Sequence, residues 1–403
     1  MVSTDFAPNE TLKDALASFK ILIQPWFFKR GKSLFRVKQR LKKFFPNQDV
    51  FLFLTARAGL YRLLQALELE KNTKVLVQGF TCEAVILPLL ELGLKPIFVD
   101  IEETTYSFDI DSLQEKIDKK TKVLILQHTF GLTPIYRKKV FDLAKKHDII
   151  VIEDLAHGFD SALFGESQTM RQYPHCALLL SFGRSKAISS VFGGAVVTRS
   201  KKLADRLKEA EKTLVYPTFL FILQCLIYKP LSVLIKASYD MLFGKVLHGF
   251  LESLNVLPKE ISTKEKGGNF DPMFLKAYPN ALAYLLQRQF KRFDQIQQHR
   301  LSISKIYIRH FLKNASPLVL QPYLRFPVLC ENRDRLLGDL KKHQIFLGTW
   351  YEVISPRGVP LSKLGYRRGS CPNAERIAAK IVNLPTQVSE KQAKMLIKHL
   401  KSP

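Results

Sequence analysis

The sequence predicts an α/β protein that has a large domain with a mostly parallel central sheet and a smaller C-terminal α+β domain. Between residues 51 and 199, short apolar runs rich in β-branched residues alternate with helical patterns, at separations that fit crossovers between parallel strands. At 403 residues the chain is too long for one simple core, so two domains are expected. Polar residues that carry chemistry follow two predicted strands, where open α/β sheets bind ligands.

Residues 1–48 form a basic and aromatic N-terminal segment. It contains the run Pro25-Trp26-Phe27-Phe28-Lys29-Arg30, followed by further lysines and arginines. Its later apolar residues have helical spacing, which predicts a helix that packs on the body and exposes a lysine-rich face. These apolar residues are Leu34, Val37, Leu41, Phe44 and Phe45.

Residues 49–213 are expected to form the large domain, because strand patterns and helix patterns alternate there as in βαβ units. The predicted helices lie near Glu83–Leu92, Ile110–Ile117 and Arg137–Lys146. The predicted strands include Val75–Val77, Pro96–Asp100, Val123–Leu126, Ile149–Asp154, Cys176–Phe182 and Gly194–Arg199.

Residues 214–270 interrupt this alternation with a hydrophobic and basic helical insertion. A membrane-spanning helix needs about 20 unbroken apolar residues, and Pro217, Lys229 and Pro230 interrupt the run here. A conventional span is therefore not expected. Two interpretations stay open: a helical hairpin over residues 214–257 that contacts an anionic membrane surface, or an insertion buried against a partner subunit or the N-terminal helix.

A long amphipathic helix is expected to link the two domains within residues 271–315. Its pattern runs from about Pro279 to His310. The remaining residues, 316–403, alternate strand and helix patterns and predict the small C-terminal domain. Four basic residues are expected on the exposed face of the linking helix, namely Arg288, Lys291, Arg292 and Arg300.

The chain is strongly basic, with 62 lysines and arginines against 36 acidic residues and a net charge of +26. Such a field favours anionic partners, which include phosphorylated metabolites and phospholipid headgroups. The basic residues are spread along the chain without a recognisable nucleic-acid motif, so no nucleic-acid partner is expected.

The cysteines and the N-terminus predict a cytoplasmic protein, associated with the inner face of the membrane if the insertion contacts lipid. No basic region followed by an apolar stretch opens the chain, so no secretory signal is expected. The five cysteines show neither a CxxC pair nor zinc-ligand spacing, which predicts free thiols and no metal site. They are Cys82, Cys176, Cys225, Cys330 and Cys371.

Two residues that follow predicted strands point to one cofactor, pyridoxal 5'-phosphate (PLP). Lys186 closes the run Ser181-Phe182-Gly183-Arg184-Ser185-Lys186, and Asp154 ends the strand before it. PLP requires a lysine that forms a Schiff base and an acid that pairs with the protonated pyridine nitrogen. His157 is placed to bond the phenolic oxygen. Each residue alone has an ordinary structural explanation, so the prediction depends on the combination.

A phosphate group needs oriented N–H donors at the start of a helix. The segment Thr55-Ala56-Arg57 lies between a short β-like run and a helical pattern, which is the expected place. Ser181, at the end of its strand, can add a hydroxyl to the same phosphate. Taken alone, Thr55 is more often a simple helix cap.

The order and spacing of these motifs resemble the DegT/StrS family of PLP-dependent sugar aminotransferases, which have the aspartate-aminotransferase (type I) fold. The resemblance covers roughly residues 50–212 and 280–400. It implies that Lys186 is the Schiff-base lysine, that Asp154 is the pyridinium partner, and that Ser181 and Thr55-Ala56-Arg57 hold the phosphate. The matching stretches are Gly79–Thr81, Ile97–Ile101, Asp109–Asp111, His128–Gly131, Ile152–Gly158, Ser181–Lys186, Gly193–Thr198, Pro372–Arg376 and Asn383–Thr386.

Several positions depart from the family pattern. Ala56-Arg57 replaces Gly-Thr, so the Arg57 guanidinium is expected to substitute for a hydroxyl. Cys82 stands where many relatives have an aromatic residue over the cofactor ring. The family's Asn-Tyr-Arg segment, which reaches the partner's site, falls at residues 275–277, so Lys276 or Asn269 takes over its role or the substrate end has changed. The resemblance also implies a sugar acceptor that is linked to a nucleotide. We expect Arg184, Lys276 and Arg325 to bind the pyrophosphate of this acceptor.

The resemblance implies a homodimer with shared active sites that transfers an amino group, from glutamate, to a keto-sugar. The acceptor would be nucleotide-linked or lipid-linked, in surface polysaccharide or amino-sugar biosynthesis. One alternative is a PLP-dependent dehydratase, against which Lys186 argues, because such relatives have histidine at that position. The other is a degenerate aminotransferase-like protein that serves as a membrane-surface or nucleic-acid binding module.

Overall fold

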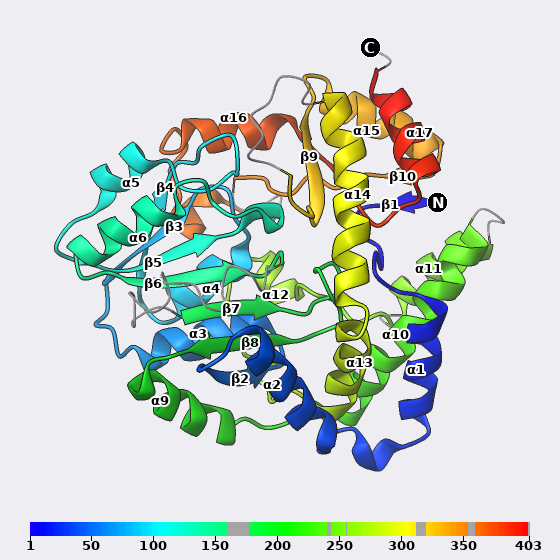
Figure 1. The fold of residues 1–403 in the computed structure, drawn as a ribbon, viewed down its shortest axis with the longest axis horizontal. Helices are drawn as coiled ribbons and strands as arrows, with labels where there is room; N and C mark the ends of the chain where they lie inside the picture. Colours follow the sequence, from blue (N-terminus) through cyan, green and yellow to red (C-terminus); the bar gives the residue numbers. More distant parts are fainter. Residues whose placement is uncertain (159–176, 240–242, 255, 312–319, 354–358, 402–403) are drawn as a thin grey trace.

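The computed structural model describes residues 1–158, 177–239, 243–254, 256–311, 320–353 and 359–401. A seven-stranded sheet forms its centre, in the order β2-β8-β7-β6-β5-β3-β4 (Figure 1). Only β8 runs antiparallel to its neighbours, so the predicted α/β class with a mostly parallel sheet is confirmed. The strands are β2 (Asp49–Phe53), β3 (Lys74–Gln78), β4 (Lys95–Val99), β5 (Thr121–Gln127), β6 (Ile150–Leu155), β7 (Ala177–Ser181) and β8 (Gly194–Thr198).

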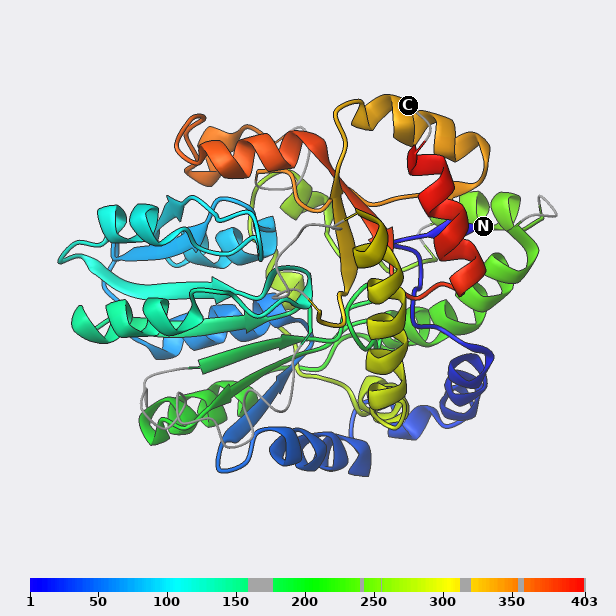
Figure 2. The same cartoon turned by 45° about the horizontal axis from the view of Figure 1, so that its top comes forward.

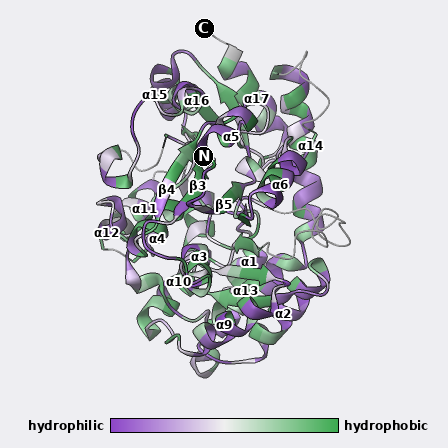
Figure 3. Ribbon diagram, turned by 90° about the vertical axis from the view of Figure 1, so that its left-hand side faces the viewer, coloured by the Kyte–Doolittle hydropathy of each residue, from purple (hydrophilic) through white to green (hydrophobic). Residues whose placement is uncertain are grey.

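Helices cover both faces of this sheet. Successive residues of each strand point to opposite faces, so Val123 and Ile125 of β5 enter one apolar cluster while Leu124 and Leu126 enter the other. Figure 3 shows green and purple alternating around these helices, as expected when one side of a helix is buried. The first face is covered by α3 (Ala56–Ala66), α4 (Glu83–Glu91) and α9 (Lys201–Lys212), and the second by α2 (Lys32–Phe44), α5 (Ile110–Lys116), α6 (Arg137–Lys146) and α13 (Asn280–Phe290).

The last part of the chain forms a smaller α+β layer above the sheet in Figure 2. Two antiparallel strands, β9 and β11, form its small sheet, and the N-terminal strand β1 (Val2–Ser3) pairs with β10. The chain's first residues therefore lie on its last domain. The elements are β9 (Arg325–Leu329), α15 (Arg333–Lys342), β10 (Ile345–Phe346), α16 (Pro372–Lys380), β11 (Ile381–Pro385) and α17 (Glu390–Lys401).

The expected linking helix is two helices, α13 and α14 (Phe293–Phe311), which meet at Lys291 and Arg292. The prediction that Arg300 lies on the exposed face is wrong. Arg300 is 1% exposed, because its guanidinium donates to the Asn9 side chain over 2.9 Å. The helical period alone places Arg300 on the outside of the helix. The N-terminal segment packs against that face, and this contact could not be predicted from the helical pattern.

The insertion folds as a helical hairpin of α10 (Phe219–Ser238) and α11 (Phe243–Ser253), followed by α12 (Thr263–Lys266). The long helix α10 packs against α1 (Leu12–Leu22) and α13. Among the described residues, α10 is the one helix long and apolar enough to cross a membrane by length and composition, and 39% of its most apolar window is buried. The insertion therefore packs against the N-terminal segment, as one of the two interpretations expected, but the contact is made by α1 and not by the helix predicted around residues 34–45.

Candidate active site

A pocket lies at the carboxyl ends of β5, β6 and β7, with about 830 Å³ of empty space when the open solvent at its mouth is included. The chain crosses from β4 over β3 to β5 beside it, and ligands of open α/β sheets bind where the strand order reverses in this way. All eight residues predicted to bind the cofactor line the pocket. They are Thr55, Ala56, Arg57, Cys82, Asp154, His157, Ser181 and Lys186.

Lys186 follows β7 and presents its amine to the pocket. The Nζ atom lies 4.7 Å from the centroid of the Trp350 ring. Burial lowers the pKa of this amine below its ordinary value, although Cys82, Glu260 and Asp154 partly offset the effect. A lower pKa favours the neutral, nucleophilic amine, which is the form that reacts with a carbonyl group.

Glu153 and Asp154 are neighbours in β6, and strand alternation sends them to opposite sides. Arg137 donates two hydrogen bonds to the Glu153 carboxylate, at 2.7 and 2.8 Å, and His128 Nε2 lies 3.0 Å from it. Burial alone would raise the pKa of Glu153, but these partners outweigh it and lower the pKa to about 2. Glu153 is therefore a structural anion at neutral pH.

Asp154 instead lines the pocket. Its Oδ1 accepts the Ala156 backbone N–H over 2.9 Å, and burial raises the pKa of the carboxyl, against the opposing effects of Ala156, Lys186 and His128. A buried carboxyl with a raised pKa gains from a cationic partner, since an opposite charge would restore the ionised form. The site therefore favours a cationic group next to Asp154.

His157 and Tyr351 form a hydrogen-bonded pair in the same pocket. The Phe130 backbone N–H donates to His157 Nδ1 over 2.9 Å, so the neutral ring carries its proton on Nε2, which donates to the Tyr351 hydroxyl oxygen at 2.5 Å. Burial lowers the pKa of His157 well below its usual value and raises that of Tyr351 well above, so both stay uncharged. Both ring nitrogens of His157, which was predicted to bond the phenolic oxygen, are thus engaged within the protein, and the Tyr351 O–H remains as a donor toward the pocket.

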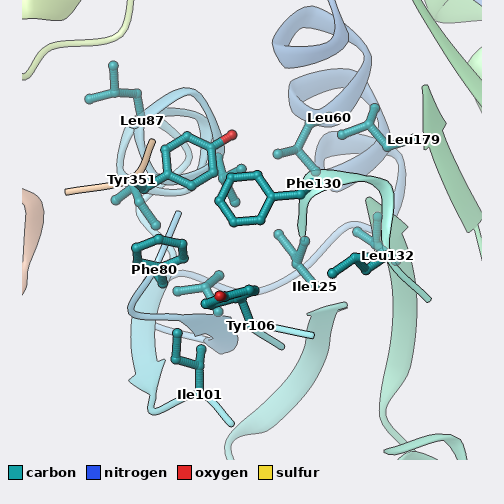
Figure 4. Close-up of a cluster of buried hydrophobic side chains, with 14 of the residues drawn as sticks. Leu60, Phe80, Leu87, Ile101, Tyr106, Ile125, Phe130, Leu132, Leu179 and Tyr351 are labelled. Carbon is teal, nitrogen blue, oxygen red and sulfur yellow. The ribbon is translucent and has the colours of Figure 1, made fainter. Parts of the chain in front are cut away.

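An apolar cluster supports this pair from below (Figure 4). Phe80 packs edge-on against both Tyr351 and Phe130, with ring centroids 5.7 and 6.2 Å apart. Leu60 and Leu179, drawn in the same view, also line the pocket. Such a wall holds the Tyr351 ring in place and excludes water from the polar groups above it.

Trp350 supplies an aromatic face that Cys82 cannot. The Trp350 ring stacks on His157 with centroids 5.3 Å apart. Cys82 lies at the start of α4, and burial raises the pKa of its thiol well above the usual value, so it is a neutral, small group there. Sequence reasoning missed both Trp350 and Tyr351, and the only signal was that Trp350 is one of two tryptophans in the chain.

The start of α3 offers backbone donors to an anion. The Thr55 hydroxyl caps the helix by accepting the Ala58 N–H over 3.1 Å, while the N–H groups of Ala56 and Arg57 lie in the first turn, where intrahelical acceptors are lacking. Gly194 of β8 permits this approach, since a Cβ there would lie 2.3 Å from the Ala56 nitrogen. Ser181 lines the same pocket. A phosphate fits this donor set.

Residues 257–266, which we call the cover segment, lie across the pocket from the same chain. Arg57, expected to face the phosphate, instead pairs with the buried Glu265 and donates to the Glu260 carbonyl oxygen over 2.6 Å. Glu260 Oε1 accepts the Arg184 backbone N–H over 2.7 Å. Glu260 and Ile261 line the pocket, and neither was predicted.

The three residues predicted to bind the acceptor do not line the pocket in the described part of the chain. Arg184 lies beside Glu260, with its guanidinium 5.1 Å from the Tyr228 ring. Arg325 is buried behind Trp350 and pairs with Asp5. The carbonyl oxygen of Lys276 accepts the Leu54 N–H, and Asn269 is exposed. The role expected for either residue, in the site of a partner subunit, stays a prediction.

The N-terminal segment fixes the backbone around Lys186. The Asn9 side chain donates to the Lys186 carbonyl oxygen over 2.6 Å. Next to it, the buried Lys229 of α10 pairs with Glu10 at 2.5 Å and donates to the Ser189 carbonyl oxygen at 3.2 Å. The first residues of the chain and the insertion thus hold the turn that carries the amine.

A family model for DegT/DnrJ/EryC1/StrS aminotransferases matches residues 10–213 and 278–400. The chain belongs to this family. The chain is 28% identical over 212 residues to the GDP-perosamine synthase of Escherichia coli O157:H7, an alignment that covers 50% of this chain and 54% of that protein. It is 22% identical over 374 residues to an uncharacterised protein of Methanocaldococcus jannaschii, covering 88% and 85% of the two chains.

The chain spans about half the length of the perosamine synthases it matches, 54% for the Escherichia coli enzyme and 48% for that of Vibrio cholerae. Solved structures of sugar aminotransferases share the fold over nearly the whole chain. Helicobacter pylori PseC superimposes with a TM-score of 0.71 at 18% identity, covering 98% of both chains, and Micromonospora echinospora CalS13 with 0.71 at 16%, covering 100% of both. The predicted type I fold is confirmed.

This member of the DegT/DnrJ/EryC1/StrS aminotransferase family has residues that fit PLP, the family's cofactor. A solved relative from Bacillus subtilis is described with bound pyridoxamine phosphate, and the fold is the same at a TM-score of 0.71 and 18% identity, over 96% of this chain and 81% of that one. In this chain, Lys186 supplies the amine, Asp154 the buried carboxyl, and the start of α3 with Ser181 the anion donors. The donor set fits the cofactor.

Proposed function

We propose that this protein transfers an amino group from an amino acid, expected to be glutamate, to a keto-sugar. The observation that supports it best is that Lys186 and Asp154 line one pocket with a helix N-terminus. The family is one of aminotransferases, and the name GDP-perosamine synthase belongs to a relative whose sugar is nucleotide-linked. A nucleotide-linked acceptor in surface polysaccharide or amino-sugar biosynthesis is therefore the first choice, and a lipid-linked sugar the second.

Bound PLP would supply the electron sink for the pair left at the substrate carbon. Lys186 Nζ, with its lowered pKa, is placed to accept and return the proton at that carbon. Asp154 would hold the ring nitrogen, and the Tyr351 O–H, oriented by His157, would donate to an oxygen on the opposite edge of the ring. Trp350 covers the amine of Lys186 and limits the access of water to it.

The reaction can be tested with isotope-labelled glutamate and a panel of nucleotide-linked keto-sugars, followed by mass spectrometry. We expect the nitrogen label in the sugar and 2-oxoglutarate as the second product. Lys186→Ala should abolish both, while Lys391→Ala, at an exposed position of α17, should leave transfer intact. Release of 2-oxoglutarate without labelled sugar would point to a different acceptor, and no release at all would overturn the proposal.

The proposal includes a homodimer. The family model leaves residues 214–277 unmatched, and this is where the insertion and the cover segment lie. In this chain, the cover segment reaches the site from within one subunit, so a partner would complete only the outer part of the pocket. Light scattering of the purified protein tests the dimer, for which twice the mass of the 46.3 kDa chain is expected.

The proposal also places the enzyme in the cytoplasm, in contact with the membrane through residues 214–257. Large apolar side chains of α10 and α11 that remain in solvent support this, among them Phe219, Leu220 and Val246. The buried Lys229 and its partner Glu10 argue against a spanning arrangement of α10, because both charges are held inside the protein. Fractionation of cells into soluble and membrane pools tests the location.

A further inference from the structure

The N-terminal helix α1 and the helix α11 expose apolar stripes along one side of the molecule. In Figures 1 and 2, both helices lie next to α10 on the same side. The exposed apolar residues of α1 recur at helical spacing, and they continue into the exposed Trp26 and Phe27, where Trp26 is 70% exposed. The stripe of α1 consists of Leu12, Leu16, Phe19 and Ile23, which directly follows the helix. The stripe of α11 consists of Phe243, Val246, Phe250 and Leu254, which directly follows the helix.

Ten large apolar side chains along α1 to Ile23, at Trp26 and Phe27, and along α11 to Leu254 are each at least 45% exposed. Monomeric proteins expose contiguous apolar patches of a few hundred Å² at most, and larger ones mark sites of contact with proteins or membranes. The opposite sides of the same helices are buried, since Ala15 and Ser18 of α1 and Leu251 of α11 are inside. These helices are therefore held firmly on the body, and their outer sides are available to a partner.

Positive charge accompanies this surface. From residue 11 to residue 48 the chain has ten lysines and arginines and a single acid, Asp14. Asp14 is 2% exposed, and it accepts hydrogen bonds from Gln289 at 3.0 Å and Arg292 at 2.6 Å. No acidic side chain of this segment therefore reaches solvent. The exposed bases are Lys13, Lys20, Lys29, Arg30, Lys32, Arg36, Lys42 and Lys43.

A basic groove lies at the edge of the apolar stripe of α1. It runs between α1 and the helices α13 and α14. Leu16 lines it together with one acid, Asp14, which pairs with Arg292, and with the basic residues Lys13, Lys20, Arg288, Lys291 and Arg292. Within the described residues, neither Lys13, Lys20 nor Lys291 forms an ion pair. Unpaired amines beside an apolar side chain match a phospholipid, whose phosphate lies next to its acyl chains.

We propose that α1, Trp26, Phe27 and α11 form a docking surface for an anionic lipid bilayer, with the groove between α1 and α13 taking lipid phosphates. The chain lies on the bilayer, with the apolar stripes at the level of the headgroups and upper acyl chains, as amphipathic interfacial helices do. This surface is independent of the proposed aminotransfer and extends beyond the insertion to the N-terminal helix. It would hold the enzyme beside membrane-bound glycoconjugates.

Vesicle sedimentation tests the surface on the PLP-loaded full chain. Binding is compared between phosphatidylcholine vesicles with and without phosphatidylglycerol, which distinguishes electrostatic from hydrophobic binding. Raised salt should release the protein from the anionic vesicles. Lys13→Glu with Lys20→Glu should weaken binding to the anionic vesicles at least about 30-fold, since each basic residue near such a surface contributes a factor of about five. A matched control is Lys391→Glu with Lys398→Glu on α17, which changes the charge equally at exposed positions elsewhere.

The apolar contribution is tested by Phe19→Ser with Ile23→Ser, for which Leu329→Ser on β9 is the control. We expect weaker binding for the α1 variants, unchanged transfer to a soluble acceptor, and an unchanged mass by light scattering. Failure of the unaltered protein to bind anionic vesicles would overturn the proposal, and so would equal losses in the control pairs. A drop in mass of the α1 variants without vesicle binding would assign this surface to contact between two copies.

Discussion

Replacement of Glu153 by Gln measures how much the buried charge of Glu153 contributes to the free energy of unfolding. Glu153 lies in β6, next to Asp154. Glu153 is fully buried, and both its oxygens are bonded to Arg137, with His128 as a third partner. Gln keeps the shape of the side chain but removes its charge and leaves the guanidinium with a neutral partner. The variant therefore isolates the charge of one residue beside the site without altering the pocket itself.

The size of the effect follows from the pKa of Glu153, which is about 2 in the folded protein against an ordinary 4.5. At about 1.4 kcal/mol for each pH unit, the ionised carboxylate stabilises the folded state by about 3 kcal/mol. Breaking a buried ion pair from one side usually costs about 3–5 kcal/mol, which agrees. We therefore expect Glu153→Gln to lower the free energy of unfolding by about 3 kcal/mol at pH 7.

Urea unfolding followed by circular dichroism measures this difference at several pH values. Because the folded pKa is lowered, the contribution of Glu153 is complete above about pH 4.5 and is lost as the pH falls toward 2. The gap between the unaltered protein and Glu153→Gln should narrow over that window. Glu209→Gln, which removes an exposed partner of Lys212, serves as the control and should change little. A gap below about 1 kcal/mol at pH 7, or one independent of pH, would refute the reasoning.

Three further predictions concern the pocket. Tyr351→Phe should weaken PLP binding by about 1 kcal/mol, as loss of one hydrogen bond to the ring does; a fluorescence titration checks this, and unchanged binding would remove the donor role. Glu10→Gln should lower the free energy of unfolding, because Lys229 loses its buried partner, and the loss is partly offset because burial raises the pKa of Glu10; an unchanged urea midpoint would contradict the ion pair. Glu260→Gln should tighten PLP binding several-fold in a fluorescence titration, since it removes a carboxylate beside the Ser181–Arg184 turn; weaker binding would show that Glu260 helps to hold the cofactor.

The central sheet could be predicted because its information is local. Each strand is a short apolar run, and Asp154 and Lys186 follow two of them in the chain. The carboxyl ends of neighbouring parallel strands meet at one edge, so the approximate meeting of these two residues needed no tertiary knowledge. The family motifs lie in these same local units, so the family and the cofactor could also be predicted from the sequence.

Contacts between distant parts of the chain could not be foreseen. The prediction that Arg300 is exposed did not take account of Asn9, which is 291 residues away in the sequence. Trp350 and Tyr351 enter the pocket from the C-terminal domain, and no periodicity marks them. Arg57 was expected to face a phosphate, yet Glu265 holds its guanidinium. In each case a long-range hydrogen bond, ion pair or ring contact decides the position of the side chain, and no local pattern encodes it.

Covalent capture of PLP tests the central claim most directly. The protein is mixed with PLP, reduced with borohydride, digested and mapped by mass spectrometry, alongside Lys186→Ala. The account predicts one dominant adduct on the Lys186 side chain, a yellow protein before reduction, and loss of both in Lys186→Ala. Adducts spread over the exposed lysines, with Lys186 unmodified, would contradict it.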